Sequence, residues 1–372
     1  MARRSLLLFA GLLAFSLAAV ACGGNGSTTG SSTASGSASM RPEDITGTIR
    51  LLSYSDGFDP KYLESFHEQY PNITLKTAAM SSNEEAVAKI QAGFEVDVVN
   101  ACVDEAALEM VQKGMYMPLD ISRLTYWNDL FPSTKTLPGV VGPDGKLYMV
   151  PVDMGTAGIV YNADVVSPPP DSWTDLFDPQ WSGRVAVEDI TITAIMIGAL
   201  ANGITDPLHM TDAQLEQVKQ FWIDHKDQFR VFWKGDASIK TLFKSGEIVI
   251  SSGYPDYAMS LQKEGMNVKF AVAKEGQFLW ACGYGITPNI DPANLDAAYA
   301  LLNWYTSPEA ELFEAETWNY QVANKDVLEI APPEVIEAAS LDAPMNMENA
   351  IPAAPPENRA AWIAVWTEVE AS

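Results

Sequence analysis

A strand-like segment near the end of the chain, FLWACGYGITP at residues 278–288, places aromatic rings beside glycines. Trp280, Cys282 and Tyr284 alternate with Gly283 and Gly285, where a purely structural strand would carry β-branched residues. Aromatic faces attract ammonium groups, and glycines let another backbone approach closely. The segment therefore predicts a strand that another backbone approaches closely, and it leaves open whether Trp280 lies at a binding surface or, as is commoner for a single aromatic residue, in a core.

A lone carboxylate, Asp153, interrupts the apolar segment YMVPVDMG at residues 148–155. A buried carboxylate without a partner is costly, so Asp153 is expected to meet either a cation or hydrogen-bond donors. Two interpretations stay open: a contact to a positively charged ligand, and a structural hydrogen bond to backbone amides.

Motifs of catalysis and of cofactor binding are missing from the sequence. The three histidines, His67, His209 and His225, are isolated from one another, and no paired cysteine–histidine spacing suggests a metal site. There is no nucleophile elbow, no H-E-x-x-H helix, no P-loop and no dinucleotide glycine fingerprint. We therefore predict a protein without enzymatic activity, cofactor or metal. A surface enzyme or an adhesion module is the alternative from another class.

The formal net charge of −25 narrows the choice of partners. Nucleic acid is excluded as an expected partner, because binding a polyanion needs a basic surface. A negative field attracts cations, although solubility alone is a commoner reason for such a charge.

The first residues predict export. Arg3 and Arg4 precede an apolar run that ends at Cys22, so residues 1–21 are predicted to be a signal peptide. The residues Ala19-Val20-Ala21 resemble a bacterial lipobox, which implies lipid attachment at Cys22; ordinary cleavage is the alternative. Residues 22–44 read as the lipid-attachment cysteine and a flexible tether, because residues 23–39 contain no charge and no large apolar side chain. We expect a lipid-anchored protein in the periplasm or on the outer face of the cell membrane.

The body of the chain alternates strand and helix patterns, which predicts an α/β fold with mainly parallel sheets. The short apolar run VDVVNA at 96–101 is typical of a buried parallel strand. The segments GPDGKLYMVPVD and AGIVYNADV, close together in the sequence, each predict a separate strand. The roughly 330 residues after the tether are enough for two packed domains.

Several segments, in order, resemble the spermidine/putrescine-binding proteins of ABC importers, a branch of the type II periplasmic binding proteins. The resemblance is carried by the following matches: LLSYSDGFDPKYLESF, VDVVNACVDE, VPVDMGTAGIVYN, SWTDLFDPQWSGRV, SGEIVISSGYPDYA, EGQFLWACGYGITP and ETWNYQVAN. It implies two α/β lobes joined by hinge strands. We place lobe 1 at residues 45–155 plus 282–327 and lobe 2 at 156–281 plus 328–372.

The resemblance also implies a ligand site between the lobes. It places four aromatic residues there: Tyr54, Tyr254, Trp280 and Tyr320. Asp189 matches one family carboxylate, whereas Ile192 and Cys282 stand where the family has two more acids. Possible substitutes for the missing acids are Asp104, Asp153, Glu188 and Asp256. The predicted site comprises Tyr54, Asp104, Asp153, Asp189, Tyr254, Asp256, Trp280, Cys282 and Tyr320.

We therefore predict a solute-binding protein that takes a polyamine or a related organic amine and delivers it, as a monomer, to a membrane permease. Because two of the family acids are missing, the sequence is also consistent with other ligands: an amino acid derivative, an opine, a phosphonate or a thiamine-like cation. Arg184 or Lys234 could hold a ligand carboxylate. Cys102 and Cys282 both map near the site, either as a disulfide or as two independent buried thiols.

Overall fold

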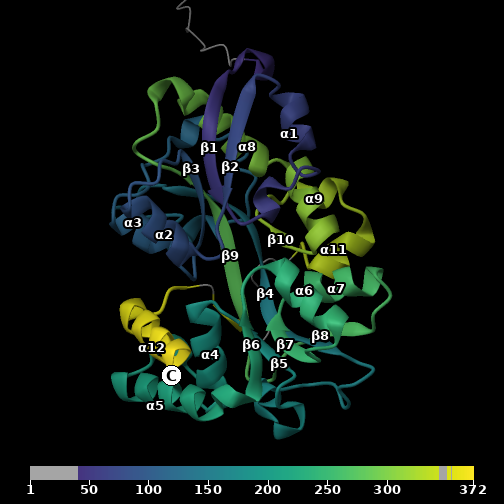
Figure 1. Ribbon diagram of the computed structural model, residues 1–372. Coiled ribbons are helices and arrows are strands. Elements are labelled where there is room, and N and C mark those ends of the chain that lie inside the picture. Colours follow the sequence, from purple (N-terminus) through teal and green to yellow (C-terminus); the bar gives the residue numbers. More distant parts are fainter. Residues whose placement is uncertain (1–40, 343–349, 353) are drawn as a thin grey trace, which may run out of the picture. The chain divides into compact units, whose positions relative to one another are not determined.

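The computed structural model describes residues 41–342, 350–352 and 354–372. The predicted signal peptide, Cys22 and the tether up to residue 40 lie outside the described residues. From Gly47 onward strands and helices alternate, as the sequence predicts (Figure 1). Among the described helices, none is both long enough and apolar enough to cross a membrane.

The described elements are mainly short strands and helices around two long strands. The strands are β1 (Gly47–Ser53), β2 (Ile73–Ala79), β3 (Val98–Cys102), β4 (Met149–Asn162), β5 (Val185–Glu188), β6 (Phe229–Trp233), β7 (Ile250–Gly253), β8 (Val268–Ala271), β9 (Gln277–Ile286), β10 (Gln321–Val322) and β11 (Ala350–Ile351). The α-helices are α1 (Glu64–Gln69), α2 (Asn83–Gln91), α3 (Ala107–Gln112), α4 (Thr191–Ala201), α5 (Asp212–His225), α6 (Asp236–Ser245), α7 (Pro255–Lys263), α8 (Leu295–Tyr305), α9 (Pro308–Trp318), α10 (Val327–Ile330), α11 (Pro333–Ala339) and α12 (Arg359–Ala371).

The first part of the sheet has the strand order β2-β1-β3-β9-β4. β1 pairs in parallel with β2 and β3, while β9 runs antiparallel to both β3 and β4. The run VDVVNA contains most of β3, and all five residues of that strand are buried, which confirms the prediction of a buried parallel strand. The first hydrophobic core forms around these strands, and it includes Ile49, Leu51, Leu52, Val98 and Val99.

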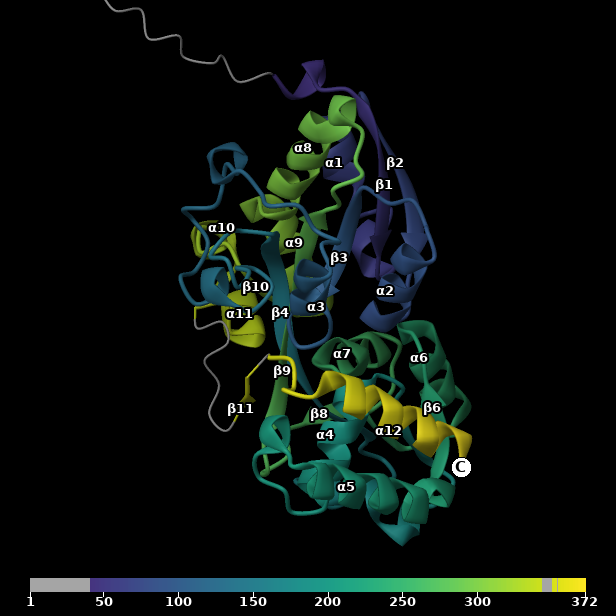
Figure 2. The same ribbon diagram turned by 90° about the vertical axis from the view of Figure 1, so that its left-hand side faces the viewer.

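The second part continues from β4 through β7 and β5 to β6. β5 pairs in parallel with β6 and β7, and the end of β4 pairs antiparallel with β7 and β8. The helices α4, α5 and α12 pack against one another beside these strands (Figure 2). Their apolar faces form a second core that contains Val187, Ile195, Trp222 and Trp366.

The long strands β4 and β9 pass from one core to the other. Along β4, Met154 belongs to the first core and Ala157 to the second. Along β9, Phe278 belongs to the second core and Leu279 to the first. Two cores joined by crossing strands form the two-lobe α/β architecture that the sequence predicts. The sequence was wrong in one detail: the two strands expected around Asp153 are one 14-residue strand, with a register shift between Pro151 and Asp153.

The helices near the C-terminus pack against different parts of the fold. α10 and α11 contact α9, whereas α12 contacts α4 and α5. These contacts favour keeping residues up to about 341 with lobe 1, since Leu341 joins a small cluster with Ala315 and Val322. The lobe boundaries given above remain a prediction.

Packing explains the glycines of β9. A Cβ atom added at Gly283 would lie 2.0 Å from the carbonyl oxygen of Val150 on β4, and one at Gly285 would lie 2.6 Å from the ring of Tyr116. Real Cβ atoms do not approach so closely, so glycine lets neighbouring groups pack onto this strand. The close approach expected from the sequence is therefore present.

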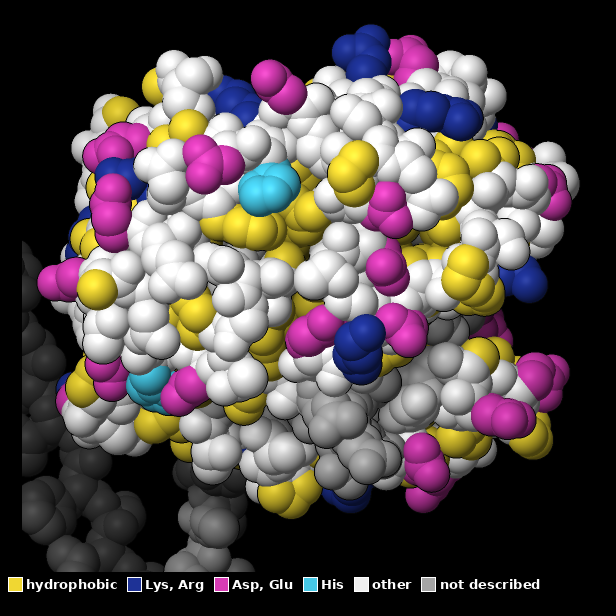
Figure 3. All heavy atoms as spheres, turned by 90° about the horizontal axis from the view of Figure 1, so that it is seen from below, with side chains coloured by type: hydrophobic (Ala, Val, Ile, Leu, Met, Phe, Trp, Pro, Cys, Tyr) yellow, Lys and Arg dark blue, Asp and Glu magenta, His cyan; other side chains and the backbone are white. Residues whose placement is uncertain are grey.

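Acidic side chains are spread over the surface. Figure 3 shows one face on which Asp and Glu side chains lie at many separate points, several of them beside Lys or Arg. Among the ion pairs of the surface, Lys219 pairs with both Glu216 and Glu368. The basic side chains visible on this face are isolated, so it offers no broad basic patch of the kind that binds nucleic acid.

Candidate ligand-binding site

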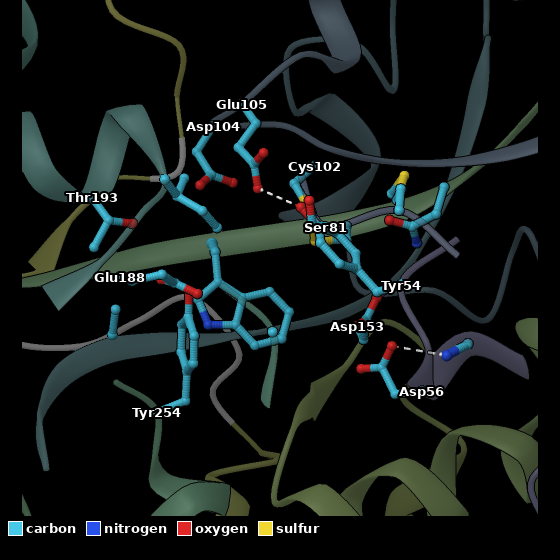
Figure 4. A pocket seen from close by; sticks show the side chains of 18 of the residues that line it. Tyr54, Asp56, Ser81, Cys102, Asp104, Glu105, Asp153, Glu188, Thr193 and Tyr254 are labelled. Carbon is cyan, nitrogen blue, oxygen red and sulfur yellow. Dashed lines mark hydrogen bonds between the residues drawn. A yellow bond between two sulfur atoms is a disulfide. The ribbon is translucent and has the colours of Figure 1, made fainter. Parts of the chain in front are cut away.

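A cavity of about 260 Å³ opens where strands of both lobes end (Figure 4). Tyr54 follows β1, Asp104 and Glu105 follow β3, Glu188 closes β5, and Tyr254 follows β7. The carboxyl ends of parallel strands are where open α/β sheets bind ligands. Seven of the nine predicted site residues line the cavity: Tyr54, Asp104, Asp153, Tyr254, Trp280, Cys282 and Tyr320.

Aromatic rings form a large part of the cavity wall. The indole of Trp280 meets Tyr254 edge-on with ring centroids 6.1 Å apart, and Tyr320 edge-on at 5.0 Å. The indole also covers Gly155 of β4, where a Cβ atom would come within 2.7 Å of the ring. Trp280 Nε1 is buried and has no hydrogen-bond partner among the described residues. The tryptophan therefore contributes both a ring face and one unused donor.

Two adjacent carboxylates, Asp104 and Glu105, lie at the end of β3. Glu105 accepts hydrogen bonds from the Tyr54 hydroxyl (3.0 Å) and from the backbone N–H of Asn83 (3.1 Å). Asp104 Oδ1 is buried without a partner in the described part of the chain. Burial raises the pKa of Asp104 to about 7, with a further contribution from the charge of Glu84. Burial, Glu84 and Asp104 together raise the pKa of Glu105 well above its usual range. Both groups would be stabilised by a positive charge in the cavity.

The expected carboxylate Asp189 does not line the cavity. Its Oδ2 pairs with Lys234 Nζ at 2.9 Å, and its Oδ1 accepts a hydrogen bond from Trp366 Nε1 at 2.7 Å. Glu188 lines the cavity instead, and it accepts a hydrogen bond from the Tyr254 hydroxyl at 2.6 Å. Successive residues of an extended strand point to opposite sides, so only one of the two acids can face the ligand.

Asp256 also lies away from the lining. It occupies the first turn of α7 and is buried, with 6% of its surface exposed. The two positions where the family has further acids, Ile192 and Cys282, do line the cavity, and there they present apolar and sulfur surface.

Comparisons with known proteins agree with this geometry. The family model for bacterial extracellular solute-binding proteins matches residues 61–343. The chain belongs to this family. It is 26% identical over 325 residues to the putrescine-binding periplasmic protein PotF of Escherichia coli, covering 81% of this chain and 84% of PotF. It is 25% identical to a gamma-aminobutyric acid-binding protein of Pseudomonas aeruginosa, covering 71% of this chain and 73% of that protein.

Solved structures share the fold of this solute-binding protein. A putative spermidine/putrescine ABC transporter protein from Listeria monocytogenes superposes with a TM-score of 0.76, at 21% identity over 87% of this chain and 99% of that one. Membership of this family makes the chain an extracellular solute-binding protein and not an enzyme.

A disulfide forms part of the cavity wall of the solute-binding protein. Cys102 on β3 and Cys282 on β9 are direct register partners, and their sulfur atoms are bonded. Both cysteines line the cavity. Of the two possibilities left open by the sequence, the bridge is the one present. It joins the strand that leads into Asp104 and Glu105 to the strand that carries Trp280.

The sequence did not identify all of the lining acids. Glu105 could have been inferred, because it directly follows Asp104 at the same strand end. Asp56 and Glu314 carried no signal, since neither interrupts an apolar run. Within the described residues, no group of three or more His, Cys, Asp or Glu side chains is arranged to hold a metal ion.

Proposed function

We propose that this solute-binding protein captures an organic ammonium ion, a polyamine such as putrescine or spermidine, and presents it to the permease of an ABC importer. In this proposal it acts as a monomer at the outer face of the cell membrane, held there by lipid on Cys22 and the tether that follows. Relatives that bind putrescine and spermidine support the choice of ligand class.

The observation that carries the proposal is the set of buried acceptor atoms in the cavity that have no partner among the described residues. These atoms are Asn100 Oδ1, Asp104 Oδ1, Asp153 Oδ1 and Glu314 Oε2. Buried acceptors without donors are costly, and a protonated amine supplies several donors and the matching charge. Lys234, which also lines the cavity, is already paired with Asp189.

Native mass spectrometry of the freshly purified protein tests this function. The expected result is one bound organic amine per chain, together with a rise in melting temperature when putrescine or spermidine is added. A retained anion or neutral sugar, with no response to any amine, would contradict the proposal.

A second candidate ligand is an ω-amino acid such as γ-aminobutyrate. Lys234 and the unused N–H of Trp280 both line the cavity, and either could receive a carboxylate. A relative binds gamma-aminobutyric acid, which supports this second candidate ligand. The polyamine is preferred because the cavity is lined by six carboxylates: Asp56, Asp104, Glu105, Asp153, Glu188 and Glu314.

Ligand affinity should also depend on Arg359, which connects the two lobes. This residue begins α12 of lobe 2, and its guanidinium pairs with Glu109 of α3 and, at 2.7 Å, with Glu84 of α2. Its side chain is only 15% exposed. These ion pairs link α12 to α2 and α3, so we expect them to favour closure of the two lobes.

Replacing Arg359 by Gln is expected to weaken putrescine binding about 10-fold, because Glu84 loses its ion-pair partner and Glu109 keeps only its pair with Lys113. Isothermal titration calorimetry measures the change. Arg41→Gln is the matched control, since Arg41 pairs with the nearby Glu43 and Asp44 at an exposed site. Equal affinities for the Arg359 variant and the wild type would show that these pairs do not assist closure.

A further inference from the structure

The Cys102–Cys282 bridge joins β3 to β9 at the last register pair between these strands. The adjoining pair is hydrogen-bonded, because the N–H of Val103 donates to the carbonyl of Ala281 at 2.7 Å. Hydrogen-bonded and non-hydrogen-bonded pairs alternate in an antiparallel ladder, so the bridged pair is a non-hydrogen-bonded one. The N–H of Cys102 accordingly donates to Asn83 Oδ1 at 2.6 Å and not to β9. At this pair the covalent bond, and not the backbone, holds the two strands together.

The bridge also lies close to the point where β9 leaves lobe 1. On its other side β9 is paired with β4, and there Cys282 is the register partner of Asp153, which directly follows the register shift of β4. Further along toward lobe 2, β9 passes from the first core at Leu279 to the second core at Phe278. The bridge therefore fastens the crossing strand to lobe 1 beside the cavity.

Hydrogen bonds connect the bridge to the acids and rings of the cavity. Asn83 is fully buried, accepts from the N–H of Cys102 and donates its own N–H to Glu105 Oε2 at 3.1 Å. Its side-chain amide donates to the hydroxyl oxygen of Tyr54 at 3.3 Å, and that hydroxyl donates to Glu105 Oε1 at 3.0 Å. Trp280 lies on β9, the strand at the other end of the bridge. A shift of β3 against β9 therefore changes the spacing between Glu105 and Trp280.

The cavity gives access to the bridge. Both cysteines are buried in the protein, and both line the cavity. Figure 4 shows Cys102 among the side chains that surround it. A small thiol reductant that enters the cavity meets the bridge, whereas a bound ligand fills the same space. Ligand and reductant therefore compete for access to the bridge.

We propose that the Cys102–Cys282 bridge is a redox switch of ligand binding: the disulfide form binds the amine tightly, and the dithiol form binds it weakly. This inference rests on the proposed function, because it concerns the regulation of that same site. Two thiols need more room than one bridge, so reduction moves β3 away from β9 or moves a sulfur atom into the cavity. Either change disturbs the pre-organised spacing between Glu105 and Trp280, and lost pre-organisation lowers affinity.

The reductant is a dithiol, and the exchange proceeds through a mixed disulfide. One thiolate of the reductant attacks the sulfur of one cysteine, and the other cysteine leaves as a thiolate. The second thiolate of the reductant then attacks the reductant sulfur of the mixed disulfide, and the first cysteine leaves in turn. Both cysteine thiolates take up the protons that the reductant gave up. Two electrons and two protons pass to the protein, and the reductant becomes a disulfide.

The state of the bridge and the occupancy of the cavity are linked thermodynamically. A ligand that binds the disulfide form about 10-fold more tightly must stabilise that form by the same factor. For a two-electron couple a factor of ten equals about 30 mV, so saturating putrescine should lower the reduction potential of the bridge by about 30 mV. Mixtures of reduced and oxidised dithiothreitol set the potential, and alkylation followed by mass spectrometry counts the free thiols.

Calorimetric titration with putrescine, before and after reduction by dithiothreitol, tests the switch directly. The dithiol form is expected to bind about 10-fold more weakly, and reoxidation should restore the affinity. The double variant Cys102→Ser with Cys282→Ser should bind as weakly as the dithiol form and should not respond to dithiothreitol. Cys22→Ser is the matched control, because it removes the remaining cysteine of the chain and should respond like the wild type.

The outcomes separate the switch from the proposed function. If the disulfide form does not bind putrescine, the proposed function fails and the switch fails with it. If both forms bind putrescine equally and the reduction potential does not change, the function stands and the switch is overturned. Circular dichroism of the reduced wild type checks folding, also where the double variant does not fold. Unfolding on reduction would overturn the switch as well, since the bridge would then stabilise the whole fold instead of controlling the site.

Discussion

Replacing Asp104 by Asn and Glu105 by Gln together is expected to weaken putrescine binding by about 100-fold or more, because two buried charged acceptors lose their attraction for the ammonium group. The fold should survive. Both acids are buried at a strand end, and their ionisation is unfavourable in the empty cavity. Calorimetry gives the affinity, and circular dichroism gives the melting temperature.

The matched control is the double variant Glu334→Gln with Glu337→Gln. It also removes two negative charges from the chain, but at exposed positions on α11. This control separates the local effect of the cavity acids from the general effect of net charge. Wild-type affinity in the Asp104 and Glu105 double variant would mean that the end of β3 does not contact the ligand.

Replacing Gly283 by Ala is expected to prevent normal folding or to lower the melting temperature by about 10 °C or more. The new Cβ would meet the Val150 carbonyl oxygen at 2.0 Å and the Pro151 Cα at 2.9 Å, and both are backbone atoms of β4. Backbone atoms in a paired strand cannot rotate away as a side chain can, so the two strands that cross between the lobes would separate. Thermal unfolding followed by circular dichroism measures the loss.

Gly145→Ala provides the comparison for this change. Gly145 has a φ of +74° but no atom within 4 Å of an added Cβ, so alanine there costs only backbone strain of about 1–2 kcal/mol. If the Gly283 and Gly145 variants lost the same small amount of stability, the close approach of β4 to β9 would not be the reason for glycine at position 283.

The sequence predicted the aromatic part of the site better than its acidic part. Tyr54, Tyr254, Trp280 and Tyr320 all line the cavity, because each lies on or next to a strand whose position in the fold the resemblance supplies. The choice between Glu188 and Asp189 depends on which side of β5 faces the ligand, and a shift of one residue reverses that choice. Local sequence contains no information on this point.

Other features depend on contacts between distant segments. Glu311 and Glu314 read as ordinary polar residues of a helix until α9 is placed behind β4. The bridge between Cys102 and Cys282 depends on the register of β3 against β9, which are 180 residues apart. The strand β4 was divided in two because Asp153 and Gly155 interrupt its apolar pattern, whereas pairing with β9 holds it together.

The most direct test of an acid-lined cavity that captures a cation is the proton balance of putrescine binding. Asp104 and Asp153 have pKa values raised to about 7, so near pH 7 each is partly protonated in the empty cavity. An ammonium group favours the ionised form, so binding must release protons, and affinity should rise from pH 5.5 to pH 8. Calorimetry at pH 7 in phosphate and in Tris, whose ionisation enthalpies differ, measures the protons released. We expect saturable binding of one putrescine per chain with net proton release; binding without proton release, or no binding, would contradict the account.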